Sequence, residues 1–555
     1  MSGASLATEA PDSTGSSRDA GAAPAQVLRF GVLTNGAALA PWQHEVLARL
    51  LETDRVVADC WLLAQPRAGA PVSDPFDDPQ RPTAPAFAVQ WLRSSSSDEI
   101  ASTFSAVQAR ELHFILSFAS PQDARFLLSA ARWGVWQFFF GDWVRFRGES
   151  EGFWEVAGDV PAATALLAQL QPESDTVRPL KQGHVRAHPI LPRATLRSLR
   201  KRCTHWPRQV CLELLDGVEE CLDGPLLRAQ APPRDRRALA SRARFVVRAV
   251  LRGLREAAHR LLLHEQWNIG LIDAPIQTLL DEPAPEPRWL CHPQRREFFA
   301  DPFGVVHQGR LTIFCEHMDY EQGVGSIVAL EESDPTRFRP VDIGPQVHRS
   351  YPFMVREGGR LFCIPETCAA SEVALYEVEQ FPDRWRHVAT LTRDLPLVDA
   401  TLFRYEERWW LAASLPAGGG ANCELHLYHA PQLEGPWQPH AANPVKVDVH
   451  SARPGGTPFY RDGALYRPAQ DCSTTYGRRV VINRIRRLSE TVFDEEIVGS
   501  VEPRRPYGAG LHTLAAAGNV TLVDAKRHVF VPQQFWLAMR FAYGKLRGRR
   551  AAQTL

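Results

Sequence analysis

Residues 298–303 of the chain read FFADPF, and a Gln308-Gly309 turn and the apolar run LTIFCE at residues 311–316 follow them. This pattern of strand, turn and strand returns along the C-terminal half of the sequence. Its copies begin about fifty residues apart, at Asp301, Tyr351, Asp399, Arg453 and His512. A repeat of this length built from strand-like segments is typical of β-propeller blades. The sequence therefore predicts an all-β, five-bladed propeller over residues 267–530.

The composition restricts the class of protein. Lysine plus arginine and aspartate plus glutamate both number 63 among the 555 residues, so the formal net charge is zero. A dedicated nucleic-acid-binding protein normally has a basic excess, so we expect no nucleic-acid partner. The ten cysteines show neither a CxxC pair nor zinc-ligand spacing, and several lie in apolar segments. This usage predicts buried free thiols in a reducing, cytoplasmic compartment, with no structural metal and no cofactor.

The two ends of the chain differ in character. Residues 1–26 are rich in Ala, Ser and Gly and lack the apolar core of a signal peptide, which predicts a disordered tail. In residues 531–555, apolar side chains at helical spacing are followed by several cations, which predicts a basic C-terminal helix. No run of 18 apolar residues occurs, so no ordinary membrane span is expected.

Residues 27–185 alternate between strand-like and helix-like segments. The predicted strands cover residues 27–34, 56–63, 112–118 and 135–140. Helices are expected at 41–52 and 121–133. Continuous apolar strands separated by helices are typical of a mostly parallel sheet covered on both faces. The segment therefore predicts a Rossmann-like α/β domain, but one without a GxGxxG fingerprint, so no dinucleotide is implied.

The last of these strands carries a resemblance. Residues 134–148 are similar to the strand and loop of the formyltransferase domain found in methionyl-tRNA and sugar-amine formyltransferases. That family has an Asn, a His two residues later, an Arg-Gly pair and a following Asp-Thr-Gly. On this spacing Gln137 takes the position of the Asn, Phe139 that of the His, and Asp175-Thr176 approximate the acidic motif. Phenylalanine cannot transfer the proton that imidazole transfers, so the resemblance implies a degenerate formyltransferase-like domain.

Residues 186–266 are rich in arginine and predict a basic connector between the two domains. Its main element is a long amphipathic helix at about residues 234–266, with aliphatic side chains on one side and arginines on the other. We expect the aliphatic stripe to pack on the two domains and the arginine side to face solvent. The alternative is peripheral contact with an anionic membrane through this helix and the C-terminal one.

Polar residues recur at equivalent positions of the repeats. The first strand of every propeller blade lines the central channel, so these residues are expected to converge at one rim. The set comprises Asp301, His348, Tyr351, Asp399, Arg453 and His512, joined from second-strand ends by Glu316, Glu366, Asp471 and Asp524. Burying ionisable groups costs free energy unless they are paired, so their accumulation predicts a site for a polar ligand.

The channel set and the motif at residues 300–303 resemble the five-bladed propellers of arabinofuranosidase and β-xylosidase type glycoside hydrolases. In those enzymes one carboxylic acid protonates the leaving oxygen and another carboxylate activates water. The resemblance implies Asp301 as general base, Asp399 as the tuning or orienting acid and Glu366 as proton donor. The residues then expected to bind substrate are Glu316, His348, Tyr351, Arg453, Asp471 and His512.

A narrower resemblance rests on six motifs in order. They are FADPF (299–303), SYPF (350–353), VDATLF (398–403), SARP (451–454), RPAQD (467–471) and GLHT (510–513). Together they resemble the propeller in the N-terminal region of plant glucosamine inositolphosphorylceramide transferases, which also occurs in bacterial proteins behind a formyltransferase-like domain. The transferase domain of the plant enzymes has no counterpart in this sequence.

These patterns predict a protein that acts on a carbohydrate or glycoconjugate, with cleavage and transfer of a glycosyl group both open. One alternative is a sugar N-formyltransferase whose propeller presents the substrate. Another is a non-catalytic glycan-binding or assembly protein. Two residue-level alternatives also stay open: Arg453 and Asp471 as a structural ion pair, and His512 as a hydrogen-bonded filler of the channel. The oligomeric state is not predicted.

Overall fold

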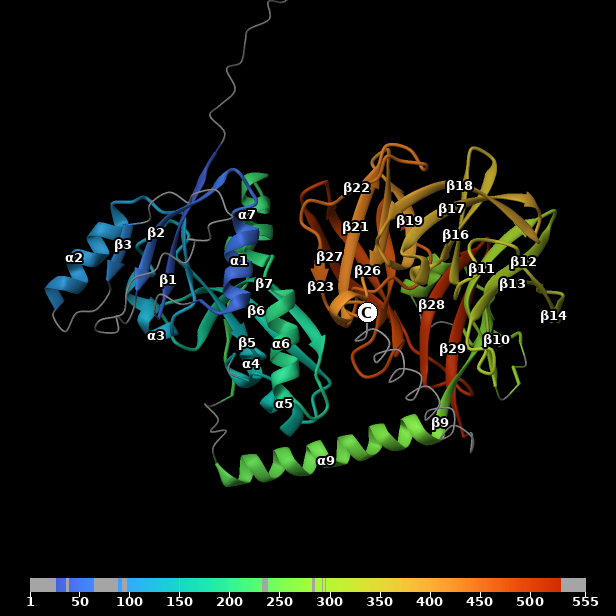
Figure 1. Ribbon diagram of the computed structural model, residues 1–555, viewed down its shortest axis with the longest axis horizontal. Helices are drawn as coiled ribbons and strands as arrows, with labels where there is room; N and C mark the ends of the chain where they lie inside the picture. The colour runs from blue at the N-terminus through green and yellow to red at the C-terminus, as the bar shows by residue number, and fades with distance from the viewer. Residues whose placement is uncertain are drawn as a thin grey trace, which may run out of the picture.

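This computed structural model of the protein describes residues 26–35, 39–63, 88–91, 97–148, 150–231, 238–281, 285–291, 293–294 and 296–530. An α/β domain and a propeller lie side by side, and the long helix α9 (Leu239–Leu262) runs beneath both (Figure 1). The predictions for the N-terminal tail and the basic C-terminal helix concern residues outside the described part.

The α/β domain is built on one eight-stranded sheet in the order β3-β2-β1-β4-β5-β6-β7-β8. The bounds are β1 (Leu28–Thr34), β2 (Val56–Leu63), β3 (Ala88–Trp91), β4 (Phe114–Ser117), β5 (Val135–Phe140), β6 (Ala162–Leu170), β7 (Thr176–Arg186) and β8 (Leu227–Arg228). Strands β1 to β5 pair in parallel, whereas β6, β7 and β8 pair antiparallel. The prediction of a mostly parallel sheet therefore holds for five strands, and the likeness to formyltransferases stays a prediction.

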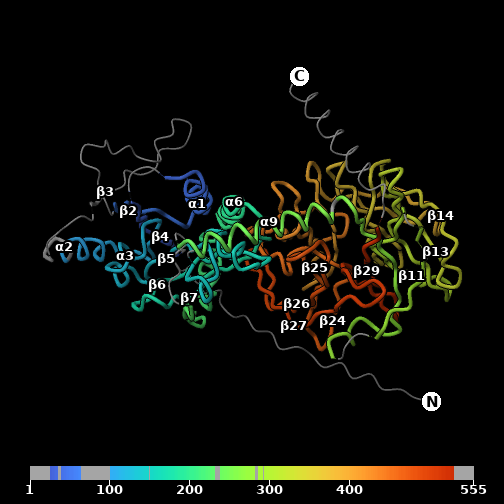
Figure 2. The backbone as a smooth tube through the Cα atoms, turned by 90° about the horizontal axis from the view of Figure 1, so that it is seen from below, coloured from blue at the N-terminus to red at the C-terminus, as the bar shows by residue number. Residues whose placement is uncertain are grey.

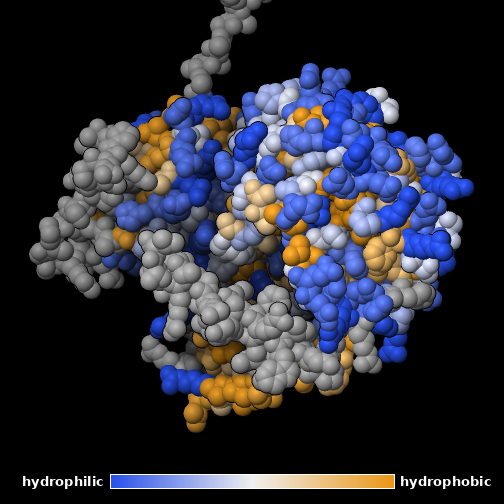
Figure 3. Space-filling view, turned by 45° about the vertical axis from the view of Figure 1, so that its right-hand side comes forward, coloured by the Kyte–Doolittle hydropathy of each residue, from blue (hydrophilic) through white to orange (hydrophobic). Residues whose placement is uncertain are grey.

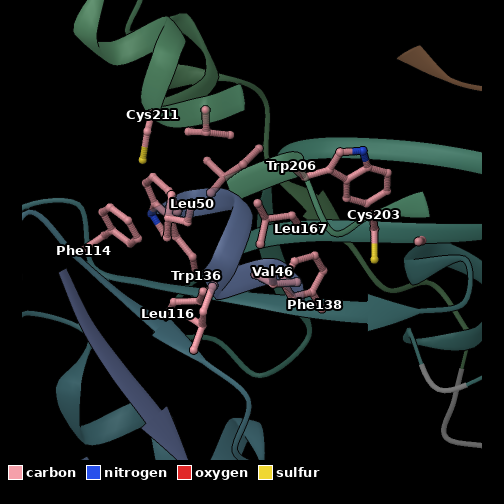
Figure 4. Packing of buried hydrophobic residues seen from close by; sticks show 14 of the residues in the cluster. Val46, Leu50, Phe114, Leu116, Trp136, Phe138, Leu167, Cys203, Trp206 and Cys211 are labelled. Atoms are coloured by element: carbon pink, nitrogen blue, oxygen red, sulfur yellow. The ribbon is translucent and has the colours of Figure 1, made fainter. Parts of the chain in front are cut away.

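The helices of this domain cover its sheet. They are α1 (Pro41–Leu50), α2 (Ser97–Gln108), α3 (Pro121–Ala124), α4 (Trp143–Phe146), α5 (Phe153–Ala157), α6 (Pro192–Arg202), α7 (Trp206–Leu215) and α8 (Glu220–Asp223). Figure 4 shows side chains of α1 and α7 meeting those of the central strands, among them Val46, Trp136 and Trp206. Residues 192–215, predicted to be part of the basic connector, belong to this core, because Leu199 and Trp206 are buried in it.

Five sheets form the propeller, so the five-bladed prediction is confirmed. The first blade holds β11 (Glu297–His307), β12 (Arg310–Asp319), β13 (Gly325–Glu331) and β14 (Asp334–Pro340). The second holds β15 (Ser350–Glu357), β16 (Arg360–Glu366), β17 (Glu372–Gln380) and β18 (Arg384–Arg393). The third holds β19 (Val398–Tyr405), β20 (Arg408–Ser414), β21 (Glu424–Ala430), β22 (Gln438–Pro439) and β23 (Lys446–Val447). The fourth holds β24 (Phe459–Arg461), β25 (Ala464–Asp471), β26 (Arg479–Leu488) and β27 (Phe493–Val501).

Strands from both ends of the propeller segment complete the fifth blade. It combines β28 (Gly510–Ala517) and β29 (Val520–Phe530) with β9 (Leu263–Ile272) and β10 (Arg288–Trp289). The ladder between β29 and β9 runs antiparallel from the Thr521–Ile272 pair to the Phe530–Leu263 pair. Backbone hydrogen bonds between the two ends of the segment therefore close the ring.

The two domains contact each other through α6 and α7. The buried guanidinium of Arg202 lies 3.2 Å from a carboxylate oxygen of Glu424 and donates to the carbonyl of Gly418 at 2.9 Å. The side-chain amide of Gln209 donates to the carbonyls of Ala442 and Pro444 at 2.8 and 2.7 Å. The third blade thus meets the helices that the sequence pattern assigned to a connector.

The orientation of α9 differs from the prediction. Ala249 faces inward, and Phe245 stacks on Phe153 of α5 with ring centroids 4.9 Å apart, while Val246, Val250 and other aliphatic side chains point to solvent. The aliphatic stripe does not pack on the domains, because the neighbouring surface offers Phe153 and the carboxylate of Asp159, which suit the opposite side of the helix. Seen from below, α9 crosses from one domain to the other (Figure 2). Among the described helices, none is long and apolar enough to cross a membrane.

Candidate functional site

The inner strands of four blades carry a β-bulge at the same place. The register shifts between Ala300 and Phe303, Ser350 and Phe353, Val398 and Thr401, and Leu511 and Leu514. The first bulged residues are Asp301, Tyr351, Asp399 and His512, and φ is 54°, 44° and 52° at the first three of these. Positive φ is costly for non-glycine residues, and such strain concentrates at functional sites. The bulges turn these side chains toward one shared region.

One cluster joins the first and fifth blades. The imidazole of His512 lies between two carboxylates, with Nε2 3.1 Å from Asp301 Oδ1 and Nδ1 2.8 Å from Asp524 Oδ1. Asp524 also accepts the backbone N–H groups of Asp301, His512 and Thr513 at 2.8, 3.1 and 2.9 Å. These are N–H groups that the bulges remove from the strand ladder, so Asp524 stabilises both bulges at once.

The imidazole in this cluster is cationic. Burial by itself lowers the pKa of His512, but the charges of Asp524 and Asp301 outweigh it and raise the pKa to about 10. The ligand atoms of Asp301, His512 and Asp524 lie within 4.8 Å of one another, which is close enough for a metal ion. However, both ring nitrogens already face a carboxylate, and one proton on each accounts for every contact. The three residues therefore fit an ion triplet better than a metal centre.

Glu316 lies beside this cluster in β12, where it pairs with Ala300 of β11. Burial and the neighbouring charge of Asp301 raise its pKa well above the ordinary value, which favours the protonated form of this carboxyl group. His348 approaches it, with Nε2 3.4 Å from Glu316 Oε1, and burial lowers the pKa of this half-exposed histidine. In this pair the neutral form of the carboxyl group and the neutral form of the imidazole are both favoured.

A second cluster joins the second, third and fourth blades. The guanidinium of Arg453 donates to both carboxylate oxygens of Asp399, from Nε at 2.6 Å and from Nη2 at 3.3 Å. Gln470 Nε2 donates to Asp399 Oδ2 at 2.7 Å. Arg453 also donates to the side chain of Asn422 at 3.0 Å. Asp399 is buried, and both of its carboxylate oxygens already accept hydrogen bonds from neighbouring side chains.

Glu366 is the more accessible carboxyl group of this cluster. It accepts the backbone N–H of Asp399 at 3.0 Å, so it also stabilises the third bulge. Burial and the charge of Asp399 raise the pKa of Glu366 to about 8, although Arg453 acts in the opposite direction. The side chain is only partly buried, so a ligand can approach it. A half-buried carboxylic acid that holds its proton at neutral pH is suited to general acid catalysis.

Aromatic side chains connect the two clusters. Arg453 lies over the ring of Tyr476 at 4.9 Å, and the rings of Tyr476 and His512 are 5.2 Å apart. Trp267 packs against His512 with centroids 4.1 Å apart, and the buried ammonium of Lys526 lies 5.0 Å from the Trp267 ring. The clusters therefore border a single region with a partly exposed aromatic side, an arrangement that suits a hydroxylated ligand with apolar ring faces.

Two residues of the predicted set are otherwise occupied. Tyr351 is fully buried, and its hydroxyl contacts Thr401 Oγ1 at 2.9 Å and accepts from the backbone N–H of Gly456 at 2.8 Å. Asp471 pairs with Arg478 and Arg479 at 3.3 and 3.0 Å, and hydrogen bonds with His450 and Ser473 outweigh burial and keep its pKa below the ordinary value. The proposed Arg453–Asp471 ion pair is therefore wrong, since Asp399 is the partner of Arg453.

The sequence reasoning missed Gln470, Asn422 and Tyr476. Gln470 precedes Asp471 in the RPAQD motif, and neighbouring strand residues point to opposite faces of the sheet. The prediction was therefore wrong by one residue: it selected Asp471, whereas the neighbouring Gln470 is the residue that contacts Asp399. Asn422 and Tyr476 lie in loops, where no period signals their position.

The three formyltransferase-like positions of the α/β domain do not form a polar site. Phe139 is buried in an apolar core, and its ring lies 4.7 Å from that of Trp143. Gln137 donates its side-chain amide to the carbonyl of Ala119 at 3.1 Å. Asp175 pairs with Arg228 at 2.9 Å, which lowers its pKa. None of the three supplies a group that titrates near neutral pH.

A separate cavity of about 370 Å³ lies on the flank of the propeller. Its lining residues are Asn268, Trp289, Cys291, Pro293, Pro506, Tyr507 and Arg527. Arg527 is held over the ring of Tyr507 at 5.0 Å and donates to Gln266 at 2.9 Å. None of the bulge residues lines this cavity, so it is distinct from the site at the channel.

Comparison with known proteins places the similarity in the propeller. Residues 291–505 match the family model described as "Glucosamine inositolphosphorylceramide transferase 1, N-terminal". Glucosamine inositolphosphorylceramide transferase 1 of Oryza sativa subsp. japonica is 35% identical over 248 residues, which are 41% of this chain and 33% of that protein. The Arabidopsis thaliana protein of the same name is 33% identical over 216 residues, 38% of this chain and 28% of that protein. The chain thus spans about a third of the length of these relatives.

Solved structures also align with the chain. The catalytic domain of a GH62 α-L-arabinofuranosidase from Coprinopsis cinerea aligns with a TM-score of 0.32 and 13% identity, over 41% of this chain and 82% of that one. A family 117 glycoside hydrolase of Zobellia galactanivorans aligns with a TM-score of 0.32 and 12% identity, over 48% and 91% of the two chains. Similarity this low carries no functional inference. What the comparisons establish is that the propeller is similar to the N-terminal region of glucosamine inositolphosphorylceramide transferases.

Proposed function

We propose that the propeller acts on the sugar part of a carbohydrate or glycoconjugate, with Glu366 as proton donor to a glycosidic oxygen. The observation that carries this proposal is the raised pKa of a half-buried Glu366 beside the Asp399–Arg453 pair. Loss of a glycosyl group from oxygen requires protonation of that oxygen, and a carboxylic acid that retains its proton at neutral pH supplies it. The similarity to proteins named glucosamine inositolphosphorylceramide transferase 1 supports a sugar as ligand.

The other groups have subsidiary roles in this proposal. Asp301 is the general base, and its contacts to Thr513 Oγ1 and His512 Nε2 at 3.2 and 3.1 Å engage Oδ1. Asp399 is a positioning residue that acts through Glu366 and Arg453. The proposal covers both hydrolysis and transfer to an acceptor, because both begin with the same protonated leaving group.

The test uses leaving groups of different basicity. Glu366→Gln in the full chain is expected to lose glycosyl cleavage of alkyl glycosides by about two orders of magnitude or more, which is the usual size of an acid catalyst's contribution. The same variant should retain cleavage of dinitrophenyl glycosides, whose leaving group needs no proton. Glu379→Gln, on an outer strand and half exposed, is the matched control and should behave as the parent. Equal loss on both substrate types, or no loss, contradicts the role of Glu366.

A second function is favoured by one observation. The carboxylates of Asp301 and Asp399 are buried and already hydrogen bonded to neighbouring side chains. Such satisfied groups suit binding of a glycan without turnover. In that case isothermal titration calorimetry detects sugar binding, and Asp399→Asn raises the Kd. No product is released from any glycoside.

For the α/β domain we infer a scaffold role without formyl transfer. Phe139 stands where the resembling family has its imidazole, and it is part of an apolar core. Titration with a formyl-folate donor is expected to give no binding, and saturable binding would contradict this inference. A cytoplasmic location also remains our proposal, which the free thiols of all ten cysteines support.

A further inference from the structure

The outward face of α9 is aliphatic. Six large apolar side chains on it are each more than half exposed: Leu239, Val246, Val247, Val250, Leu251 and Leu254. Figure 3 shows the apolar surface along the bottom of the molecule, where α9 lies in Figure 1. Exposed apolar patches of this extent are unusual on a monomer and mark a surface that binds something.

Contacts on the inner side fix this orientation. Phe245 stacks on Phe153, Arg252 pairs with Asp159, and Ala249 is buried against the α/β domain. On the same side Arg186 lies 3.6 Å from Glu256, which is the only acidic residue in the helix sequence. Because these contacts occupy the inner side, the aliphatic stripe cannot turn inward without breaking them.

Arginines flank the stripe on both sides. At 100° per residue, Arg242 lies along one edge, and Arg244, Arg248 and Arg255 lie along the other. All four are at least partly exposed. A continuous apolar stripe bordered by cations, with no acidic group on the outward face of the described helix, is the pattern of a helix that lies in the plane of an anionic membrane surface.

We propose that α9 binds the surface of an anionic phospholipid bilayer, with its aliphatic stripe inserted among the acyl chains and its arginines at the phosphate groups. Two other occupants fit the charges less well. A second copy of α9 would bring arginine rows against arginine rows. Residues 531–555 carry Lys545, Arg547, Arg549 and Arg550, so this segment would also place cations beside cations.

The position of α9 determines which part of the propeller would lie near the bilayer. The helix ends at Leu262 and continues directly into β9, whose Trp267 packs against His512. At the same end, the ring of His259 lies 4.4 Å from that of His528 in β29. A bilayer held by α9 therefore adjoins the end of the propeller at which the His512 cluster lies.

The test is flotation of the full chain with vesicles. Vesicles containing phosphatidylglycerol are expected to carry the protein, and pure phosphatidylcholine vesicles are not. The double variant Val250→Asp and Leu254→Asp should reduce binding at least about tenfold, since loss of two inserted aliphatic side chains exceeds 1.4 kcal/mol. Arg244→Glu with Arg255→Glu should weaken binding to the anionic vesicles and reduce its salt dependence.

Further measurements distinguish insertion into the bilayer from self-association and from misfolding of the variants. Val306→Asp makes the same chemical change at an exposed valine of the propeller and should leave vesicle binding unchanged. Thermal unfolding of the α9 variants should match the parent, because the altered side chains are exposed. Absence of binding to anionic vesicles overturns the proposal. So does a stripe variant that changes the mass in light scattering, which indicates a second copy, or vesicle binding that appears only after residues 531–555 are deleted.

Discussion

The α/β domain and the propeller differ in the environment of their candidate site residues. In the α/β domain the position of a catalytic imidazole is held by Phe139, packed in a core, and Asp175 forms an exposed ion pair. In the propeller, Asp301, Asp399 and His512 are buried at β-bulges and paired with neighbouring charges, and φ is positive at Asp301 and Asp399. Burying ionisable groups costs free energy, so this difference is the reason that our proposal assigns the function to the propeller and not to the α/β domain.

The largest expected effect is on the buried pair of the propeller. Asp399→Asn leaves the guanidinium of Arg453 buried without an anionic partner, which should lower the free energy of unfolding by about 4 kcal/mol. Asp175→Asn, the matched change at the exposed pair of the α/β domain, should leave the unfolding midpoint unchanged. Urea unfolding followed by tryptophan fluorescence measures both. Equal effects of the two variants would break the comparison.

A second variant tests whether Phe139 has a packing role alone. Phe139→Ala opens a cavity in the apolar core and should lower the stability of the α/β domain by about 3 kcal/mol. The glycosyl cleavage proposed for the propeller should be unchanged at temperatures below the lowered Tm. Phe139→His should give no affinity for a formyl-folate donor, and tight binding by that variant would show that the site had been lost by this one substitution.

The pH dependence of stability sharpens the comparison further. The pKa of His512 rises from 6.5 to about 10 on folding, so its contribution is fully present below pH 6.5 and is lost as the pH rises through about 10. The free energy of unfolding should fall by about 1 kcal/mol per pH unit across this window. His512→Gln should flatten this slope. A parent protein with the same stability at both ends of the window contradicts the cationic triplet.

Glu366 provides a second test through the pH dependence of stability. Its pKa is raised from 4.5 to about 8, so the folded state binds a proton that the unfolded state releases, and stability declines as the pH rises from about 4.5 to 8. Glu366→Gln imitates the protonated acid and should remove this decline while leaving stability at pH 5 nearly unchanged. Thermal unfolding at pH 5 and pH 8 provides the comparison, and an unchanged difference between the two would argue against a protonated Glu366.

The sequence predicts the propeller because the inner strand, the turn and the second strand of each blade recur as recognisable motifs. The sequence did not predict the bulges. The extra residue that turns Asp301 and Asp399 inward follows the same sequence pattern as a regular strand. The period of α9 identified its stripe but not the direction in which the stripe points. That direction depends on Phe153 and Asp159, which are far away in the sequence. Likewise, the many cationic residues of α6 led to its interpretation as a connector, although its Leu199 packs in the core.

The fifth blade has a consequence for synthesis of the protein. Strand β9 is the first propeller strand to be made, and its partner β29 follows about 250 residues later, after four other blades. At translation rates of roughly 5 to 20 residues per second, β9 waits on the order of ten seconds or more with an unpaired edge. An open strand edge is a template for pairing with other chains. Premature termination anywhere before β28 therefore yields an unclosed ring, whose free edge marks the chain for chaperones or for aggregation.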